Sequence, residues 1–470
     1  MYDFLKYILQ VSKNSIGVVA LAVIIGLAGL ITGCSVFHKK HNGRGHFPWE
    51  KGFLWLVFAG YIALIVSVTL LRQGGGYKSW NLHLFRAWIE AWNNYSVKSW
   101  SNVLLNIALF LPLGALLPLL GKPFRKWYLT MPAGFAVSLS IEVLQLAMGA
   151  GIWDVDDLFI NTLGTAIGFL FIMAVLALFR EKECRLKPCL AYSGLLLAIL
   201  ASIGSIFLSY HLQEYGNLPT APAYRINMGD TRWEMRCQLP FANKILPVYR
   251  TQNRTLKDCD AFARDIAKLE NATVAFTSYY QDFAYYMLYS GEAQTGVLQV
   301  SYYDESYEYF AMGNGFDEDF VAVDRETMEA ALGRYPVSIP ACAAFFVDED
   351  KWHIFSVDMY LEGDRMYDGT LRCRFSSDGT LTEIENNLLS YHYYDTASVI
   401  SPTEAYQALC AGSFNDDGYF ERIRPGKLVV LSCELAYEID TKGFNQPVYL
   451  FAVEAEDGSY KNTVMIPAMQ

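Results

Sequence analysis

The sequence is poor in the residue patterns on which most enzymes and metal proteins depend. Histidine occurs only seven times in 470 residues, and three of the seven lie between positions 38 and 46. No Ser/His/Asp or Cys/His arrangement, no phosphate-binding glycine loop and no zinc-ligand spacing is present. These absences argue against a hydrolase, and they predict neither a metal ion nor a cofactor.

Charge is also scarce, and its sign changes along the chain. Charged residues make up 18% of the sequence. Residues 1–210 contain 17 Lys and Arg against 9 Asp and Glu, whereas the remainder contains 20 against 39. The acidic remainder argues against nucleic acid as a partner, and against direct adhesion to anionic polymers unless cations bridge them. We therefore expect the two parts to occupy different surroundings.

Long apolar runs fill the first part. Each of six stretches approaches the ~20 residues that an α-helix needs to cross ~30 Å of hydrocarbon. They lie at 16–37, 53–71, 101–120, 128–149, 157–179 and 189–209. We predict a polytopic α-helical membrane domain with six transmembrane helices at 1–210, a linker at 211–223 and an extracytoplasmic α+β domain at 224–470.

The loops between these stretches set the predicted orientation in the cell membrane. Three of them are basic, and positive charge marks the cytoplasmic side. They lie at 38–51, 121–127 and 180–187. The N-terminus and the C-terminal domain are then outside. The stretch "LITGC" at 30–34 offers an alternative, because it resembles a bacterial lipobox in which Cys34 is lipidated after cleavage. Such processing would turn all three basic loops outward, so we favour an intact chain.

Polar side chains recur on single faces of three predicted spans, because residues three and four apart share a helix face. The faces are formed by Asn102 and Asn106, by Ser138, Glu142 and Gln145, and by Asp157, Asn161, Gly164 and Gly168. At ~1.5 Å per residue, Asn106, Glu142 and Asn161 lie ~6–11 Å beneath the predicted outer surface. Three helices therefore place polar groups at one depth.

We interpret this agreement as a polar pocket that opens outward. An ionisable group within a span is costly unless it is paired, faces the bundle interior or lines a wet cavity. The predicted ligand-binding residues are Asn106, Glu142, Gln145, Asp154, Asp156, Asp157 and Asn161. Gly164 and Gly168 would let a neighbouring helix approach closely, and Pro112 and Gly114 are expected to bend the third span.

Other readings give these residues smaller roles. Asp156 or Asp157 could cap the fifth helix, because carboxylates favour helix N-termini. Glu142 could bond to an asparagine of a neighbouring span, which is worth about 1 kcal/mol. The Asp-x-Asp-Asp run at 154–157 could hold Ca²⁺ or Mg²⁺ through oxygen ligands, although no further ligands follow at a defined spacing.

Three blocks of the membrane part resemble the VanZ-like family. They are "NIALFLPLGALLPLL" at 106–120, "SIEVLQ" at 140–145 and "DVDDLFINTLGTAIGF" at 154–169, preceded by "WNLHLF" at 80–85. The resemblance covers about 75–180 and implies a protein of the bacterial cell envelope, mostly of Gram-positive species. The founding member is associated with low-level resistance to the glycopeptide teicoplanin, and the resemblance implies no catalytic residue. Members often carry an arginine shortly before the Asp motif, whereas "GAGIW" at 149–153 has none.

Helical and strand patterns alternate in the C-terminal part and predict its α+β fold. Helices are expected at 259–270, 324–333 and 401–412, and strands include 352–363 and 427–439. One reading divides the domain into two α/β repeats at 224–335 and 336–470. The helix-then-hairpin ending is similar to exported accessory domains of the YycI/YycH kind, which in that family bind and regulate membrane sensor kinases.

Cysteines and tyrosines of the C-terminal part each permit two interpretations. Six cysteines could form three disulfides in an oxidising compartment or serve as small buried hydrophobic residues. They are Cys237, Cys259, Cys342, Cys373, Cys410 and Cys433. Tyrosines are dense at 278–291 and 301–310. We expect cross-strand pairs in antiparallel sheets there rather than a surface for sugars or peptides.

Three functional hypotheses follow. In the first, the pocket binds an outer-leaflet envelope lipid, a lipid-linked precursor or an antibiotic, and contributes to teicoplanin resistance. In the second, Glu142 and Asp157 are the acid–base pair of a membrane enzyme acting on a lipid headgroup. The sequence supplies no nucleophile, so binding ranks above catalysis. In the third, the protein is the accessory regulator of a membrane sensor kinase or of another envelope protein.

Overall fold

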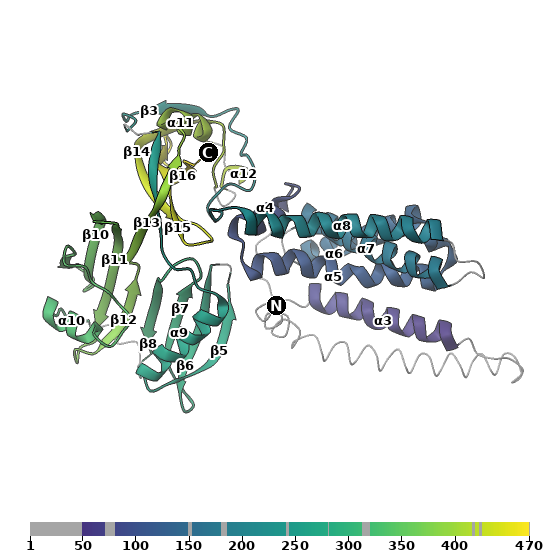
Figure 1. The fold of residues 1–470 in the computed structure, drawn as a ribbon, viewed down its shortest axis with the longest axis horizontal. Helices are drawn as coiled ribbons and strands as arrows, with labels where there is room; N and C mark the ends of the chain where they lie inside the picture. The colour runs from purple at the N-terminus through teal and green to yellow at the C-terminus, as the bar shows by residue number, and fades with distance from the viewer. Residues whose placement is uncertain are drawn as a thin grey trace, which may run out of the picture. The chain divides into compact units, whose positions relative to one another are not determined.

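The computed structural model describes residues 49–70, 80–148, 153–179, 186–240, 244–280, 282–312, 320–415, 419–422 and 425–469. The chain divides into two compact units, which are drawn in Figure 1. The first, here called the membrane unit, contains the residues up to 88 together with 99–213. The second, here called the β-rich unit, contains 89–98 and 214–470.

Five helices of the described chain are long and apolar enough to cross a membrane. They are α3 (Trp49–Leu70), α5 (Val97–Leu120), α6 (Trp127–Met148), α7 (Val155–Phe179) and α8 (Leu186–Leu212). The short helix α4 (Arg86–Asn94) precedes α5, and η1 (Lys122–Arg125) joins α5 to α6. Five of the predicted spans are therefore confirmed as apolar helices. The predicted span at 16–37 lies outside the described residues.

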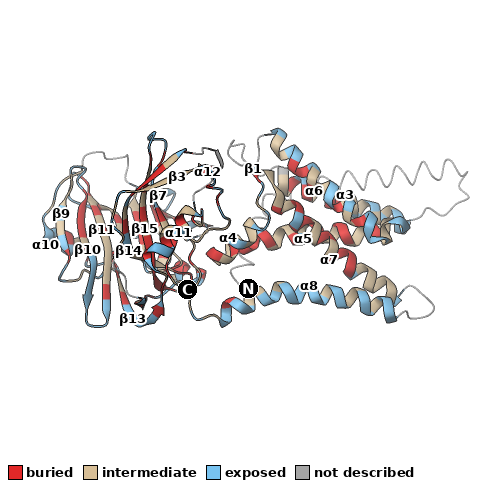
Figure 2. Cartoon of the chain, turned by 90° about the horizontal axis from the view of Figure 1, so that it is seen from above, coloured by how far each residue is buried: buried red, intermediate tan, exposed pale blue. Residues whose placement is uncertain are grey.

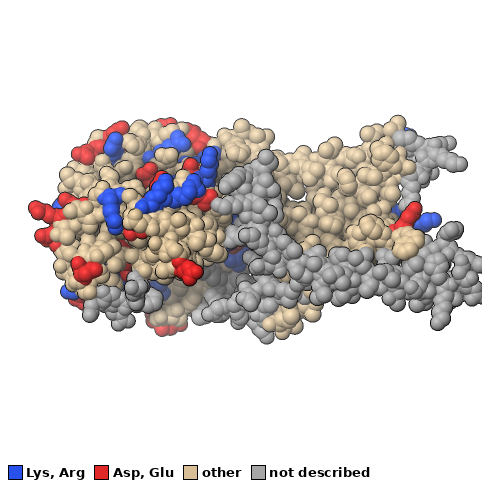
Figure 3. All heavy atoms as spheres, turned by 90° about the horizontal axis from the view of Figure 1, so that it is seen from below, with Lys and Arg blue, Asp and Glu red and all other residues tan. Residues whose placement is uncertain are grey.

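The surfaces of these helices suit an apolar solvent. Figure 2 shows α8 exposed along most of its length, although its sequence is strongly apolar. Figure 3 shows charged side chains gathered on the β-rich unit, whereas the visible face of the membrane unit carries few. A helix that is apolar all round needs either a protein core or lipid around it. The arrangement is that of a multi-pass membrane protein.

Glycines bring α5 and α7 into backbone contact. A Cβ atom built on Gly114 would lie 1.9 Å from the carbonyl oxygen of Thr165. One built on Gly168 would lie 1.9 Å from the carbonyl oxygen of Leu111, and Gly164 faces the backbone of α5 at 2.2 Å in the same way. Only a hydrogen atom fits at these positions, so the small residues set the distance between the two helices.

A sheet of 14 strands dominates the β-rich unit, and its described pairings are antiparallel except that of β3 with β14. The strand order is β3-β14-β15-β4-β13-β11-β12-β8-β7-β6-β5, with β10 and β9 branching from β11 and β16 from β15. The first strands are β3 (Arg232–Met235), β4 (Ile245–Arg250), β5 (Thr273–Tyr279), β6 (Phe283–Ser290), β7 (Ala293–Ser301), β8 (Tyr307–Ala311) and β9 (Ala344–Val347). The others are β10 (His353–Glu362), β11 (Arg365–Phe375), β12 (Leu381–Asn386), β13 (Leu389–Ser398), β14 (Lys427–Ile439), β15 (Phe444–Ala455) and β16 (Lys461–Pro467).

Four helices in the described part of the β-rich unit accompany this sheet, and three of them were expected from the sequence. They are α9 (Leu256–Leu269), α10 (Arg325–Leu332), α11 (Pro402–Cys410) and α12 (Tyr419–Arg422). α9 and α11 each begin with a capping box, in which the side chains of Thr255 and Ser401 accept backbone N–H groups of the first turn. The placement of this unit outside the cell stays a prediction.

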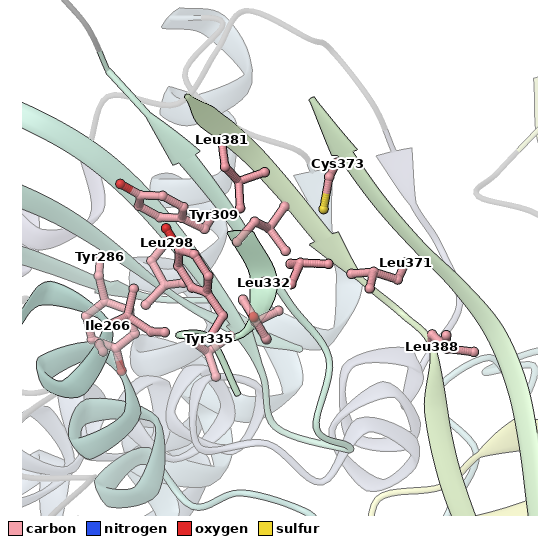
Figure 4. Close-up of a cluster of buried hydrophobic side chains, with 14 of the residues drawn as sticks. Ile266, Tyr286, Leu298, Tyr309, Leu332, Tyr335, Leu371, Cys373, Leu381 and Leu388 are labelled. Atoms are coloured by element: carbon pink, nitrogen blue, oxygen red, sulfur yellow. The ribbon is translucent and has the colours of Figure 1, made fainter. Parts of the chain in front are cut away.

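Two large hydrophobic cores and two smaller clusters stabilise the described part of the β-rich unit. In the first, Tyr286 and Tyr309 flank Leu298 in register on three antiparallel strands and pack against Ile266 of α9, as Figure 4 shows. The expected placement of tyrosines in antiparallel sheets is therefore confirmed for β6 and β8. This core also includes residues after 336, where the second predicted repeat begins, and the repeat itself stays a prediction. The second core joins residues 226–246 to 399–468.

The six cysteines of the β-rich unit are all free thiols in this structure. Cys259, Cys373 and Cys433 are buried, and the first two lie in the core around α9. Burial raises the pKa of the Cys259 thiol to about 12, which keeps it neutral. These observations favour the reading in which the cysteines are small hydrophobic residues.

Candidate functional site: a polar cluster among the membrane helices

A two-residue strand pair connects distant parts of the membrane unit. β1 (Trp80–Asn81) pairs in parallel with β2 (Trp153–Asp154), which leads directly into α7. The Asn81 side-chain amide donates a hydrogen bond to Asp154 Oδ1 over 2.9 Å. The pair therefore fixes the segment before α4 against the first turn of α7.

Asp156 binds the backbone of the same segment, which precedes α4 and includes its first residues. The Asp156 carboxylate is fully buried in the first turn of α7 and accepts hydrogen bonds from the backbone N–H groups of Phe85 and Ala87, the latter over 2.6 Å. Its own N–H donates to Asp154 Oδ1 over 2.8 Å. A carboxylate at a helix N-terminus also interacts favourably with the helix dipole. Asp156 therefore acts as a structural anchor.

Three helices contribute the remaining polar side chains. Glu142 of α6 is only 2% exposed, and its Oε2 accepts the backbone N–H of Asp154 over 3.1 Å. Asn106 of α5 donates its side-chain N–H to Asp157 Oδ1 over 2.8 Å. Asn161 of α7 donates to the Ser138 hydroxyl of α6 over 2.9 Å. We call the group Asn81, Asn106, Ser138, Glu142, Asp154, Asp157 and Asn161 the polar cluster.

The predicted site residues divide into those that meet and those that do not. Asn106, Glu142, Asp154, Asp157 and Asn161 meet in the polar cluster, with Asp156 beside it. Gln145 instead donates its amide to the backbone carbonyl of Thr69 on α3, over 3.0 Å. Asn102 is exposed. α5 continues through Pro112, and the bend expected there stays a prediction.

Ser138 was placed on the face of Glu142 but was not among the predicted ligand-binding residues. Asn81 is the residue of the polar cluster that the sequence placed on no helix face. It lies in a loop rather than a span, so helix spacing could not place it beside Asp154. The signal available in the sequence was its position in "WNLHLF", one of the blocks that resemble the VanZ-like family.

Hydrogen-bond acceptors outnumber donors in the polar cluster. Burial raises the pKa of Asp154, while the bonds from Asn81 and from the Asp156 N–H act in the opposite direction. Asn161 is 5% exposed, and among the described residues its side-chain Oδ1 has no hydrogen-bond partner. Buried polar atoms are nearly always bonded, so such an acceptor calls for an explanation. The cluster can receive hydroxyl, amide or ammonium donors.

The described residues contain no group of three or more His, Cys, Asp or Glu that could hold a metal ion. The reading of Asp-x-Asp-Asp as a Ca²⁺ or Mg²⁺ site therefore finds no support in this part of the chain. Asp154 and Asp156 instead use their oxygens for Asn81 and for backbone N–H groups.

A separate cavity of about 680 Å³ lies in the β-rich unit. Its lining includes the acidic residues Asp282, Asp304, Glu308 and Glu438. Glu438 is far from the other three in the sequence, so no local pattern predicted their meeting. Burial, with the charge of Asp304 as a smaller cause, raises the pKa of Glu438 to about 7.

The shifted pKa of Glu438 predicts a pH-dependent stability of the β-rich unit. The pKa of Glu438 is higher in the folded state than in the unfolded state. Its contribution to the free energy of unfolding is therefore fully present below the unfolded pKa, and it is lost as the pH rises through about 7. Gln does not ionise, so Glu438→Gln should lose less stability than wild type as the pH rises. Between pH 5 and pH 8 we expect the difference in free energy of unfolding to shift by about 1–3 kcal/mol in favour of the variant. Urea unfolding of the full-length protein, followed by brief proteolysis of the β-rich unit, measures this difference. The exposed Glu305 supplies the control Glu305→Gln, and equal pH profiles for wild type and Glu438→Gln would contradict the prediction.

Comparison with known proteins agrees with this architecture. A multi-pass bundle with a buried acidic cluster at the start of one helix defines the class as a polytopic membrane protein. Residues 58–179 match the family model VanZ/LLP1, which spans most of α3 and all of α5, α6 and α7 with the entire polar cluster. This segment is therefore similar to VanZ-family membrane proteins, and the β-rich unit is a separate region beyond it. The predicted resemblance is confirmed. No curated protein matches the chain.

Proposed function

We propose that this VanZ-like protein works in the bacterial cell envelope and that its polar cluster binds the polar group of an outer-leaflet molecule. The ligand class is an envelope lipid, a lipid-linked precursor or a glycopeptide such as teicoplanin. Binding of this kind would contribute to glycopeptide resistance by withholding the antibiotic or its target.

The unpartnered acceptor of Asn161 is the observation that carries this proposal. It lies in a cluster that also contains Glu142, Asp154 and Asp157, all of which accept rather than donate as carboxylates. Lipid-linked precursors and glycopeptides are rich in hydroxyl, amide and ammonium donors, so their chemistry complements the cluster. Polar groups inside a span are costly, which supports a functional reason for keeping them.

The test uses two variants that keep the shape of the side chain and remove its charge. We expect Glu142→Gln and Asp157→Asn, expressed in cells that lack the native copy, to be as sensitive to teicoplanin as the deletion strain. Membrane abundance is measured first, so that lost protein is not mistaken for lost function. Asn102→Ala is the matched control, because Asn102 is exposed one helical turn before Asn106.

The outcomes separate the three hypotheses. If both variants are abundant but sensitive, with lipid precursors unchanged, the cluster binds its ligand. Accumulated precursor in both variants would instead favour the acid–base reading of Glu142 and Asp157. Full resistance in both variants would contradict the proposal, and would move the function to the β-rich unit and the accessory-regulator hypothesis.

A further inference from the structure

In the loop at 80–85 a polar side chain is buried and apolar side chains are exposed, which is the reverse of the usual arrangement in a soluble protein. Asn81 is 5% exposed and faces the protein. The apolar residues face outward, with exposed fractions of 55% for Trp80, 67% for Leu82, 47% for Leu84 and 45% for Phe85. Soluble proteins rarely expose adjoining large apolar side chains without a partner. The face formed by these four side chains is here called the apolar loop face.

Several backbone N–H groups in and after this loop are bonded within the protein. The N–H of His83 donates to Asn81 Oδ1 over 3.1 Å, and the N–H groups of Phe85 and Ala87 donate to the Asp156 carboxylate. Phe85 has a positive φ of 70°, a conformation that a bulky residue adopts only when its surroundings impose it. Polar backbone groups near the hydrocarbon must find partners within the protein, because lipid offers none.

The loop also lies at a defined level of the bundle. β1 pairs with β2 immediately before α7, which is the level where that membrane-spanning helix begins. The Phe85 ring packs edge-on against Phe159, at 5.2 Å between centroids, and Phe159 is itself exposed on the first turns of α7. The apolar loop face is therefore continuous with the exposed apolar surface of a candidate span. Aromatic residues are enriched at this level of membrane proteins.

We propose that the loop at 80–85 is embedded in the bilayer interface at the end where α7 begins, and that the apolar loop face contacts lipid. Asp156 is the positioning residue, because it supplies the acceptors that intrahelical carbonyls supply in a helix. This inference does not depend on the ligand of the polar cluster. Lipid is the occupant that fits, because the loop combines an exposed apolar face with buried polar groups and internally bonded backbone N–H groups.

Photocrosslinking of the purified full-length protein in phosphatidylcholine–phosphatidylglycerol vesicles tests the proposal. The substitution Leu82→p-benzoylphenylalanine places the probe on the apolar loop face. The same probe at Phe171, exposed on α7, is the positive control, and at Leu431, exposed on β14, the negative control. Intact-mass analysis is expected to show lipid adducts at 82 about tenfold above those at 431 and comparable to those at 171.

Two results would overturn the proposal. Absence of lipid adducts at 82, with adducts present at 171, would place the loop in water. A covalent dimer at 82 would assign the apolar loop face to a second copy of the chain. Asp156→Ala combined with the probe at 82 tests the positioning role, and is expected to lower lipid adducts at 82 but not at 171. The single-probe comparison decides the proposal even where Asp156→Ala fails to accumulate.

Discussion

Gly168→Val is expected to prevent accumulation of folded protein. The first side-chain atom at this position would lie 1.9 Å from the Leu111 carbonyl oxygen and 3.1 Å from the Ala115 backbone nitrogen. Both are backbone atoms of α5, so no side-chain rotation relieves the overlap. The helices would have to separate, which also pulls Asn106 away from Asp157. Overpacking of this kind costs at least about 3 kcal/mol when the backbone must move.

A matched control exists on another span. Gly204 lies on α8, and a Cβ built there would meet no atom within 4 Å. Gly204→Val should therefore leave abundance and melting temperature close to those of wild type. Fluorescence-detected size exclusion of a fusion protein, with heating before injection, measures both quantities. A monodisperse Gly168→Val protein with an unchanged melting temperature would show that α5 and α7 are not in close contact.

Asp440→Ala is expected to destabilise the β-rich unit as strongly as Gly168→Val destabilises the membrane unit. The fully buried Asp440 carboxylate accepts four hydrogen bonds: from the backbone N–H groups of Gly216, Lys442 and Phe444, and from the Gln446 amide, over 2.6–2.9 Å. Removing the acceptor leaves buried donors without partners, which costs roughly 3–5 kcal/mol in total. Asp440→Asn is expected to do little better, because its NH₂ group would face donors.

The neighbouring hairpin supplies the control. Asp457, in the turn between β15 and β16, also accepts a backbone N–H from its own turn, but it is exposed. Asp457→Ala should cost less than about 1 kcal/mol, because water replaces the lost acceptor. Urea midpoints for protease resistance of the β-rich unit, in the full-length protein, compare the two variants. Equal midpoints would show that Asp440 does not stabilise the linker and hairpin that it joins.

Local sequence patterns predicted the regular helices more accurately than they predicted the residues of the polar cluster. The apolar runs gave five spans to within a few residues, and Ser401-Pro402 marked the start of α11 because cap and first-turn residues act locally. Helix spacing also brought Glu142 and Asp157 to one cluster. It failed for Gln145, whose side chain instead donates a hydrogen bond to Thr69 of α3. Helix periodicity predicts which residues of one helix share a face. It does not predict which neighbouring helix packs against that face.

The parts that escaped prediction depend on long-range pairing. The β1–β2 pair joins two dipeptides with no alternation or turn signal, yet it determines where Asn81 and Asp156 act. In the β-rich unit strands such as β10 and β14 were predicted, but others such as β11 and β13 were not, and neither was the order of the strands in the sheet. Strand order depends on contacts between residues far apart in sequence, and no local propensity records these contacts.

The pairing of β3 with β14 has a consequence for how the protein is made. Lys427 lies opposite Arg232, so β3 can pair only after β14, nearly 200 residues later in the sequence, has been synthesised. β4 likewise takes its neighbours from β13 and β15. A nascent chain lacks these partners until residues 389–455 have been synthesised, and folding dominated by such distant contacts is slow. The described membrane helices are thus synthesised and available for insertion before the partners of β3 and β4 exist.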